Sequence, residues 1–215
     1  MLPERTIIFD FDGTLADTLP RIVAISNRLA PEYGYRPVLE EEIEWLRGKR
    51  SREVLRHLKI PLFKVPTLAL RLKAELQKEI HLVRPFASIR SVVGQLTLHY
   101  RLGIVTSNSV ANVNQFLDAN DMPYFEFVRS SAGLFRKGRV LHRVTHEHSL
   151  SKNETLYVGD EVRDIEAARA CGIDTIAVAW GANRLDKLLE ARPRFVAHRP
   201  EELLEIVATW QPTKR

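Results

Sequence analysis

Four segments of the chain are continuous apolar runs, and polar or turn residues follow them. They are residues 5–10 (RTIIFD), 102–106 (LGIVT), 155–158 (TLYV) and 174–179 (DTIAVA), and a weaker run covers 125–129 (FEFVR). Short runs rich in β-branched residues are typical of strands that are buried on both faces of a parallel sheet. Helical patterns separate the runs, so we expect an α/β fold with a doubly wound, Rossmann-like parallel sheet.

Residues 17–85 depart from this alternation because they have helical patterns throughout. The expected helices are about 18–30, 40–47, 51–58 and 66–82, with Pro31, Gly34, Pro37, Gly48 and Pro61 between or near their ends. We therefore predict a small α-helical cap domain at 17–85, inserted after the first strand, and an α/β core made of 1–16 and 86–215. A last helix that begins near Pro200 and Glu201 is expected to cover the sheet.

The composition excludes several classes of protein. Of 215 residues, 45% are hydrophobic and 27% are charged, which is typical of a soluble globular protein and not of a disordered one. No stretch approaches the roughly 20 apolar residues of a membrane helix. Cys171 is the only cysteine, so neither an intramolecular disulfide nor a multi-thiolate zinc site is possible. The apolar run near Thr6 is too short for a signal peptide, so we expect a cytoplasmic protein.

The positive charge is concentrated in the predicted cap. The net charge is +5, and residues 17–85 hold 14 basic and 9 acidic side chains, which accounts for all of it. Arg47, Lys49, Arg50, Arg52 and Arg56 form a basic cluster there. A solvated helix face is the usual explanation for such a cluster, and an anionic partner is the alternative.

Polar residues follow the predicted strands at the edge where open parallel sheets bind ligands. These residues are Asp10, Asp12, Gly13 and Thr14 after the run 5–10, Thr106, Ser107 and Asn108 after the run 102–106, and Asp160 with Asp164 after the run 155–158. Four carboxylates in or near one pocket would raise one another's pKa unless a cation lay among them. An all-oxygen ligand set favours Mg²⁺.

The order of these motifs resembles the haloacid dehalogenase-like hydrolase superfamily. Residues 5–19, 101–108, 155–172 and 176–183 are similar to its phosphoglycolate phosphatase-like branch, which has a helical cap after the first motif. This resemblance implies that Asp10 attacks phosphorus, Asp12 exchanges a proton with the leaving oxygen, and Thr106 hydrogen-bonds the phosphoryl group. It also implies that Mg²⁺ binds to the side chains of Asp10 and Asp160 and to the Asp12 carbonyl, with Asp164 behind them.

Further candidates belong to the same motifs. Gly13, Thr14, Ser107 and Asn108 are expected to bind substrate. The family also requires a basic residue, for which Lys137 is our choice. Arg136, which stands where a glycine is common, could share that role, and Lys152 is a third candidate.

The sequence thus predicts a Mg²⁺-dependent phosphatase that hydrolyses a small phosphate monoester, phosphoglycolate or another anionic metabolite, through an aspartyl phosphate. A phosphomutase or pyrophosphatase of the same superfamily is an alternative, although Ile22 replaces the histidine expected of the mutases. A catalytically silent module that binds nucleic acid or protein is a second alternative. We expect a phosphorylated metabolite as partner, no nucleic acid and no membrane, and leave monomer or homodimer open.

The basic cluster suggests how the cap could select substrate. Gly48 marks a turn between two predicted cap helices, and such turns approach the substrate when a cap closes. Arg47 and Lys49 are therefore expected to meet a second anionic group on the substrate.

Overall fold

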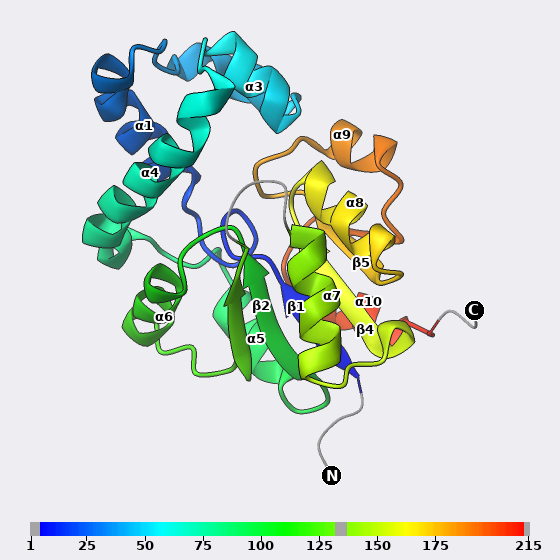
Figure 1. Cartoon of the computed structure of the whole chain (residues 1–215). Coiled ribbons are helices and arrows are strands. Elements are labelled where there is room, and N and C mark those ends of the chain that lie inside the picture. The colour runs from blue at the N-terminus through cyan, green and yellow to red at the C-terminus, as the bar shows by residue number, and fades with distance from the viewer. Residues whose placement is uncertain (1–4, 132–136, 213–215) are drawn as a thin grey trace.

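A computed structural model of the chain describes residues 5–131 and 137–212. At its centre is a six-stranded sheet with the strand order β3-β2-β1-β4-β5-β6, and every neighbouring pair is parallel (Figure 1). The strands are β1 (Thr6–Phe9), β2 (Arg101–Thr106), β3 (Phe127–Ser130), β4 (Thr155–Gly159), β5 (Asp174–Val178) and β6 (Phe195–Ala197). The predicted fold class is confirmed.

Helices surround the sheet and also form the insertion between β1 and β2. The core helices are α5 (Ile89–Leu96), α6 (Val110–Ala119), α7 (Lys137–Glu147), α8 (Val162–Ala170), α9 (Leu185–Glu190) and α10 (Glu202–Thr209), with a 3₁₀ turn η4 (Lys152–Glu154). The insertion contains α1 (Leu19–Tyr33), α2 (Ile43–Arg47), α3 (Ser51–His57) and α4 (Val65–Glu79), with the 3₁₀ turns η1 (Glu40–Glu42), η2 (Leu62–Lys64) and η3 (Ile80–Leu82). No described helix has the length and apolar character needed to span a membrane.

Alternate residues of β1 pack on opposite faces of the sheet, as the two-residue period of a strand requires. Ile7 and Phe9 belong to the larger apolar cluster, which includes side chains of α5 and α10. Ile8 belongs to a second cluster that includes side chains of α7 and α8. Figure 1 shows these two helix layers in front of and behind the sheet. The continuous apolar run of β1 thus reflects burial on both faces.

The strand order changes direction at β1. The chain proceeds from β1 to β2 and β3 on one side, and then returns to β4, β5 and β6 on the other. Ligands bind beyond the carboxyl ends of strands at such a switch point. The residues that follow β1 and β4 are therefore the ones to expect in a site.

The two chain segments that join the core to the helical insertion lie side by side. The Asp17 N–H donates to the Arg84 carbonyl at 3.0 Å, and the Phe86 N–H donates to the Leu15 carbonyl at 3.2 Å. Figure 1 shows α1, α3 and α4 beyond the strand ends, apart from the sheet. These hydrogen bonds support the division at 16/17 and 85/86, which stays a prediction. We call residues 17–85 the cap.

Some elements differ from those the sequence predicted. Strand β6 was not predicted, because three residues give no usable period. Helix α1 continues past Pro31 and ends at Tyr33. Gly34 follows it, and its φ of 69° suits the residue after a helix C-terminus. The pattern of residues 139–149 predicts a helix after Lys137, whereas helix α7 covers Lys137–Glu147 and so includes that lysine.

Candidate active site

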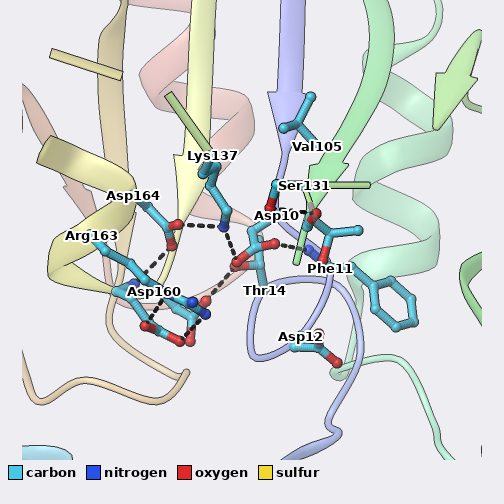
Figure 2. A network of polar contacts seen from close by, with 12 residues as sticks. Asp10, Phe11, Asp12, Thr14, Val105, Ser131, Lys137, Asp160, Arg163 and Asp164 are labelled. Carbon is cyan, nitrogen blue, oxygen red and sulfur yellow. Dashed lines mark hydrogen bonds and ion pairs between the residues drawn. The ribbon is translucent and has the colours of Figure 1, made fainter. Parts of the chain in front are cut away.

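Three buried carboxylates meet at the carboxyl end of the sheet. Asp10 follows β1, Asp160 follows β4, and Asp164 lies in the first turn of α8. One oxygen atom of each lies within 4.8 Å of the other two, and Figure 2 shows the three side chains together. We call this group the carboxylate cluster. It unites three of the four residues that the sequence predicted as metal ligands.

The Asp10 carboxylate is oriented by its neighbours. The Asp10 N–H donates to the Val158 carbonyl at 2.8 Å, which extends the contact between β1 and β4 by one residue. The Phe11 N–H donates to Oδ1 at 2.8 Å, and the Lys137 ammonium donates to Oδ2 at 2.7 Å. Both carboxylate oxygen atoms are thus held in place before any substrate binds.

Two loops hold Asp160. The Thr14 hydroxyl donates to Oδ1 at 2.9 Å, and the Ala182 N–H donates to Oδ2 at 2.6 Å. Gly13 has a φ of +75°, and a Cβ atom there would lie 2.1 Å from Asp160 Oδ2. The structure therefore explains Gly13 and Thr14 by their contact with Asp160, and their predicted role in substrate binding stays a prediction.

Lys137 joins two members of the cluster. Its side chain is 4% exposed, and its ammonium lies 2.7 Å from Asp10 Oδ2 and 2.5 Å from Asp164 Oδ1. Burial alone would lower the pKa of Lys137, but the charges of these two carboxylates raise it. Arg136 lies outside the described residues, and Lys152 is exposed on η4. Of the predicted basic candidates that the structure describes, Lys137 is the one that contacts Asp10.

The protein does not fully balance the charge of the cluster. Burial raises the pKa of Asp10 to about 7, although the charge of Lys137 opposes the shift. Burial also raises the pKa of Asp160, and the neighbouring Glu161 and Asp164 add to the effect. Carboxylates are therefore held in an environment that disfavours their charged forms.

The charge count and the donor atoms fit a divalent cation. Arg163 lies beside the cluster and pairs with Glu161, with Nε 2.5 Å from Oε2 and Nη2 2.7 Å from Oε1. The three clustered carboxylates and Glu161 exceed the two cations, Lys137 and Arg163, by two charges. Carboxylate oxygen atoms without nitrogen or sulfur donors favour a hard ion such as Mg²⁺. The residues present thus fit the predicted cofactor.

Asp12 lies outside the carboxylate cluster, although only one residue separates it from Asp10. Figure 2 shows its carboxyl group directed away from the other three. Asn108 Nδ2 donates to both of its oxygen atoms, at 2.9 and 3.2 Å. Burial raises the pKa of Asp12, which favours the protonated acid. Two carboxylates close together in sequence thus have different surroundings.

A pocket of about 260 Å³ opens beside Asp12, between the core and the cap. We call it the catalytic pocket. Its lining includes Asp12, Gly13, Ser107, Asn108, Glu161 and Arg163 from the core, and Leu19, Ile22, Ala69, Leu72, Lys73 and Leu76 from the cap. Ser107 and Asn108 thus line this pocket, and their contact with substrate stays a prediction. Thr106 is fully buried one residue deeper, and its hydroxyl accepts the Asn108 N–H at 3.1 Å, so its contact with a phosphoryl group stays a prediction.

Arg47 and Lys49 lie at the cap turn but do not line the catalytic pocket. The Arg47 guanidinium donates to the Gly181 carbonyl and to Glu44, both at 2.7 Å. The Lys49 ammonium lies 4.5 Å from the centre of the Trp45 ring. Both residues line an adjoining, mostly apolar hollow of about 360 Å³. Their predicted contact with substrate stays a prediction.

Two further residues near Asp12 were not predicted from the sequence. Lys73 of α4 lines the catalytic pocket, and burial lowers its pKa although the charge of Asp12 opposes the shift. Asn112 of α6 is buried, and its Nδ2 donates to Asn108 Oδ1 at 2.9 Å and to the Lys73 carbonyl at 3.1 Å. One signal was available: Lys73 interrupts the apolar stripe of a predicted helix.

Comparisons with known proteins identify the family to which the chain is similar. The family model for haloacid dehalogenase-like hydrolase matches residues 7–178. The chain is 35% identical over 205 residues to phosphoglycolate phosphatase of Synechococcus elongatus, covering 94% of this chain and 97% of the relative. It is 28% identical over 193 residues to phosphoglycolate phosphatase of Xylella fastidiosa, with 82% and 81% covered. The solved structure of a haloacid dehalogenase-like family hydrolase from Streptococcus pneumoniae matches with a TM-score of 0.81 at 22% identity, covering 94% of this chain and 98% of that one.

The chain belongs to the haloacid dehalogenase-like hydrolase family. Within that family it is a phosphatase, a phosphoric monoester hydrolase, and the resemblance to the phosphoglycolate phosphatase-like branch is confirmed.

Proposed function

We propose that this enzyme hydrolyses a small anionic phosphate monoester, with phosphoglycolate as the first candidate, through an aspartyl phosphate on Asp10. The observation that carries the proposal is the different setting of Asp10 and Asp12. Asp10 is held in the carboxylate cluster by Lys137, whereas Asp12 contacts Asn108 outside it. One carboxylate suits a nucleophile and the other suits a proton donor. The relatives named phosphoglycolate phosphatase support the choice of first substrate.

In the first step, an Asp10 oxygen atom attacks phosphorus and the bond to the leaving oxygen breaks. Asp12 gives its proton to that oxygen, which leaves as an alcohol. In the second step, Asp12 takes a proton from water, the water oxygen attacks phosphorus, and Asp10 is released with inorganic phosphate. Lys137 stabilises the negative charge of Asp10 before the attack and after its release, because its ammonium contacts that carboxylate directly.

Asp10 and Asp160, with the Asp12 carbonyl, would hold Mg²⁺, and Asp164 would support the site from behind. When bound, Mg²⁺ would supply positive charge where a carboxylate must approach an anionic phosphate. Thr14 and the Ala182 N–H orient Asp160 for this role. Lys137 forms ion pairs with both Asp164 and Asp10, and so connects the expected metal site with the nucleophile.

The alternatives receive less support. No histidine is among the described side chains that line the catalytic pocket, and Ile22 lies there instead, which disfavours a phosphomutase. The basic cluster is partly engaged within the protein: Arg47 donates to Gly181, and Arg50 lies 3.8 Å from Glu166. That engagement disfavours a nucleic-acid surface. The predicted cytoplasmic location and the choice between monomer and homodimer stay predictions.

The test is phosphate release from a panel of phosphorylated metabolites with Mg²⁺ or with a chelator, ranked by kcat/KM. We expect phosphoglycolate and similar anionic esters to rank first, and the chelator to stop turnover. The matched control is Asp10→Asn, which nearly preserves volume and should abolish turnover. Turnover by a folded Asp10→Asn variant would contradict the covalent mechanism. A panel without any hydrolysed monoester would contradict the proposed function.

A further inference from the structure

The catalytic pocket holds two cationic side chains with different surroundings. Arg163 is paired with Glu161 through two contacts. Lys73 of α4 forms no salt bridge with any residue that the structure describes, yet it is only partly exposed. The charge of Asp12 offsets part of the cost of burying this ammonium, but no described carboxylate is in ion-pair contact with it, so an anion that meets it would lower that cost further. The pocket therefore contains a cation that is available to a ligand.

Hydrogen bonds connect the backbone of Lys73 to Asp12. The Asn112 amide donates to the Lys73 carbonyl at 3.1 Å and to Asn108 Oδ1 at 2.9 Å. Asn108 in turn donates to the Asp12 carboxylate at 2.9 Å. This chain of contacts joins a cap helix to the residue proposed to protonate the leaving oxygen. Lys73 is thus held on the leaving-group side of the reaction.

The apolar neighbours of Lys73 on α4 would strengthen an ion pair between its ammonium and a bound anion. Ala69, Leu72 and Leu76 line the catalytic pocket from the same face of the helix, at the spacing of three and four residues that places side chains together. Water is displaced from such a surface when a ligand fills it. An ion pair in that setting is screened less than one at the protein surface.

We propose that Lys73 binds a second anionic group on the leaving alcohol of the substrate, and so selects phosphate esters that carry a carboxylate. The inference rests on the proposed function and adds the residue that determines specificity. It differs from the sequence prediction for Arg47 and Lys49, which are engaged at the cap turn and lie outside the catalytic pocket.

The experiment compares Lys73→Met with the unmodified enzyme on two esters, phosphoglycolate and ethyl phosphate, which differ by a carboxylate in place of a methyl group. A hydrogen-bonded charge pair contributes enough to predict a loss of about 10- to 100-fold in kcat/KM for phosphoglycolate, mainly through KM. Ethyl phosphate should change by less than about 2-fold. Lys73→Arg keeps the charge and should recover part of the loss for phosphoglycolate.

Lys78→Met is the matched control, because Lys78 is an exposed lysine of the same helix that pairs with Glu75. It should leave both esters unchanged. An equal loss for both esters in Lys73→Met, or no loss for either, would overturn the proposal. A selective loss in Lys49→Met without one in Lys73→Met would also overturn it, and would assign the second anion to the cap turn.

A binding measurement separates this inference from the proposed function. In an Asp10→Asn background, calorimetry should show that Lys73→Met weakens phosphoglycolate binding by about 10-fold or more while ethyl phosphate binding is unchanged. If ethyl phosphate is hydrolysed but Lys73→Met leaves phosphoglycolate binding intact, the Lys73 proposal fails and the phosphatase function stands. If no monoester of the panel is hydrolysed while Lys73→Met still weakens phosphoglycolate binding selectively, the proposed function fails and the anion site stands.

Discussion

Replacement of Lys137 by methionine should both destabilise the protein and stop turnover. The side chains of Lys137, Asp10 and Asp164 are 4%, 3% and 1% exposed, so both ion pairs are shielded from water. Removal of one partner from a buried ion pair costs about 3 to 5 kcal/mol, because the remaining charge loses its compensation. For a chain of this size, that loss lowers Tm by about 6 to 20 °C.

The assay is thermal unfolding in chelator and in excess Mg²⁺, together with kcat for phosphoglycolate. We expect Mg²⁺ to restore part of the lost stability of Lys137→Met, because a cation among the carboxylates replaces some of the missing charge. Turnover should stay low in both buffers, since the ammonium that contacts Asp10 is absent. Lys152→Met, at an exposed lysine of η4, is the matched control and should change stability by less than about 0.5 kcal/mol.

Three results would contradict this reasoning. If Lys137→Met unfolds at the same temperature as the unmodified protein in chelator, the ion pairs do not stabilise the carboxylate cluster. If it also keeps its kcat, the basic role belongs to another residue, and Arg136 becomes the next candidate. A loss of stability that Mg²⁺ does not change would indicate lost packing instead of lost charge.

Three further predictions concern Asp12, the metal ligands and the cap. Asp12→Asn should lower kcat/KM, which reports the step that releases the alcohol, by about 10²- to 10⁴-fold for phosphoglycolate and by much less for nitrophenyl phosphate, since a good leaving group needs no proton; equal losses in kcat/KM would contradict the acid role. Asp160→Ala should weaken Mg²⁺ binding in calorimetry more than Asp164→Ala does, and the reverse order would mean that their roles are exchanged. Burial opposes the shift, but hydrogen bonds from His57 and neighbouring groups lower the pKa of Glu42 from 4.5 to about 2. The free energy of unfolding should therefore be about 1 kcal/mol higher with Glu42 than in Glu42→Gln above pH 4.5, and this difference should vanish as the pH falls toward 2. Urea unfolding of both proteins across that range measures it, and a difference that stays constant would contradict the prediction.

The central strands of the core could be predicted because consecutive residues in them are apolar and buried. Ile7, Ile8 and Phe9 are all fully buried, and this produces an apolar run without alternation. Strand β6 has three residues, of which Ala197 is fully buried, so its pairing with β5 depends on contacts from distant parts of the chain. Local pattern is sufficient for the central strands and insufficient at this edge of the sheet.

The carboxylate cluster could also be predicted, because the topology brings the ends of β1 and β4 together. Asp10 and Asp160 each follow a strand directly, so the positions of the strands determine where the carboxylates lie. Lys137 was a choice between neighbours, and it depends on how α7 begins. A positive charge is unfavourable at the start of a helix, and the ion pairs of Lys137 with Asp10 and Asp164 compensate for it. Both partners are distant in the sequence, so the local pattern does not predict this position.

The cap shows why charge in a sequence is a weak guide to a binding residue. A cluster of basic residues suggests a binding site, but a side chain in it can form hydrogen bonds or ion pairs with groups nearby in the protein. Arg47 does so with Glu44 and with the Gly181 carbonyl. A single lysine within an apolar helix face has no such partner nearby, and the cost of desolvating it must be met by something outside the helix. Lys73 is such a residue, and the pocket beside Asp12 is the place where an anion could meet it. In a cap whose helices are predicted from apolar spacing, the charged residue that breaks the spacing is therefore a better candidate for substrate recognition than the basic cluster that precedes it in the chain.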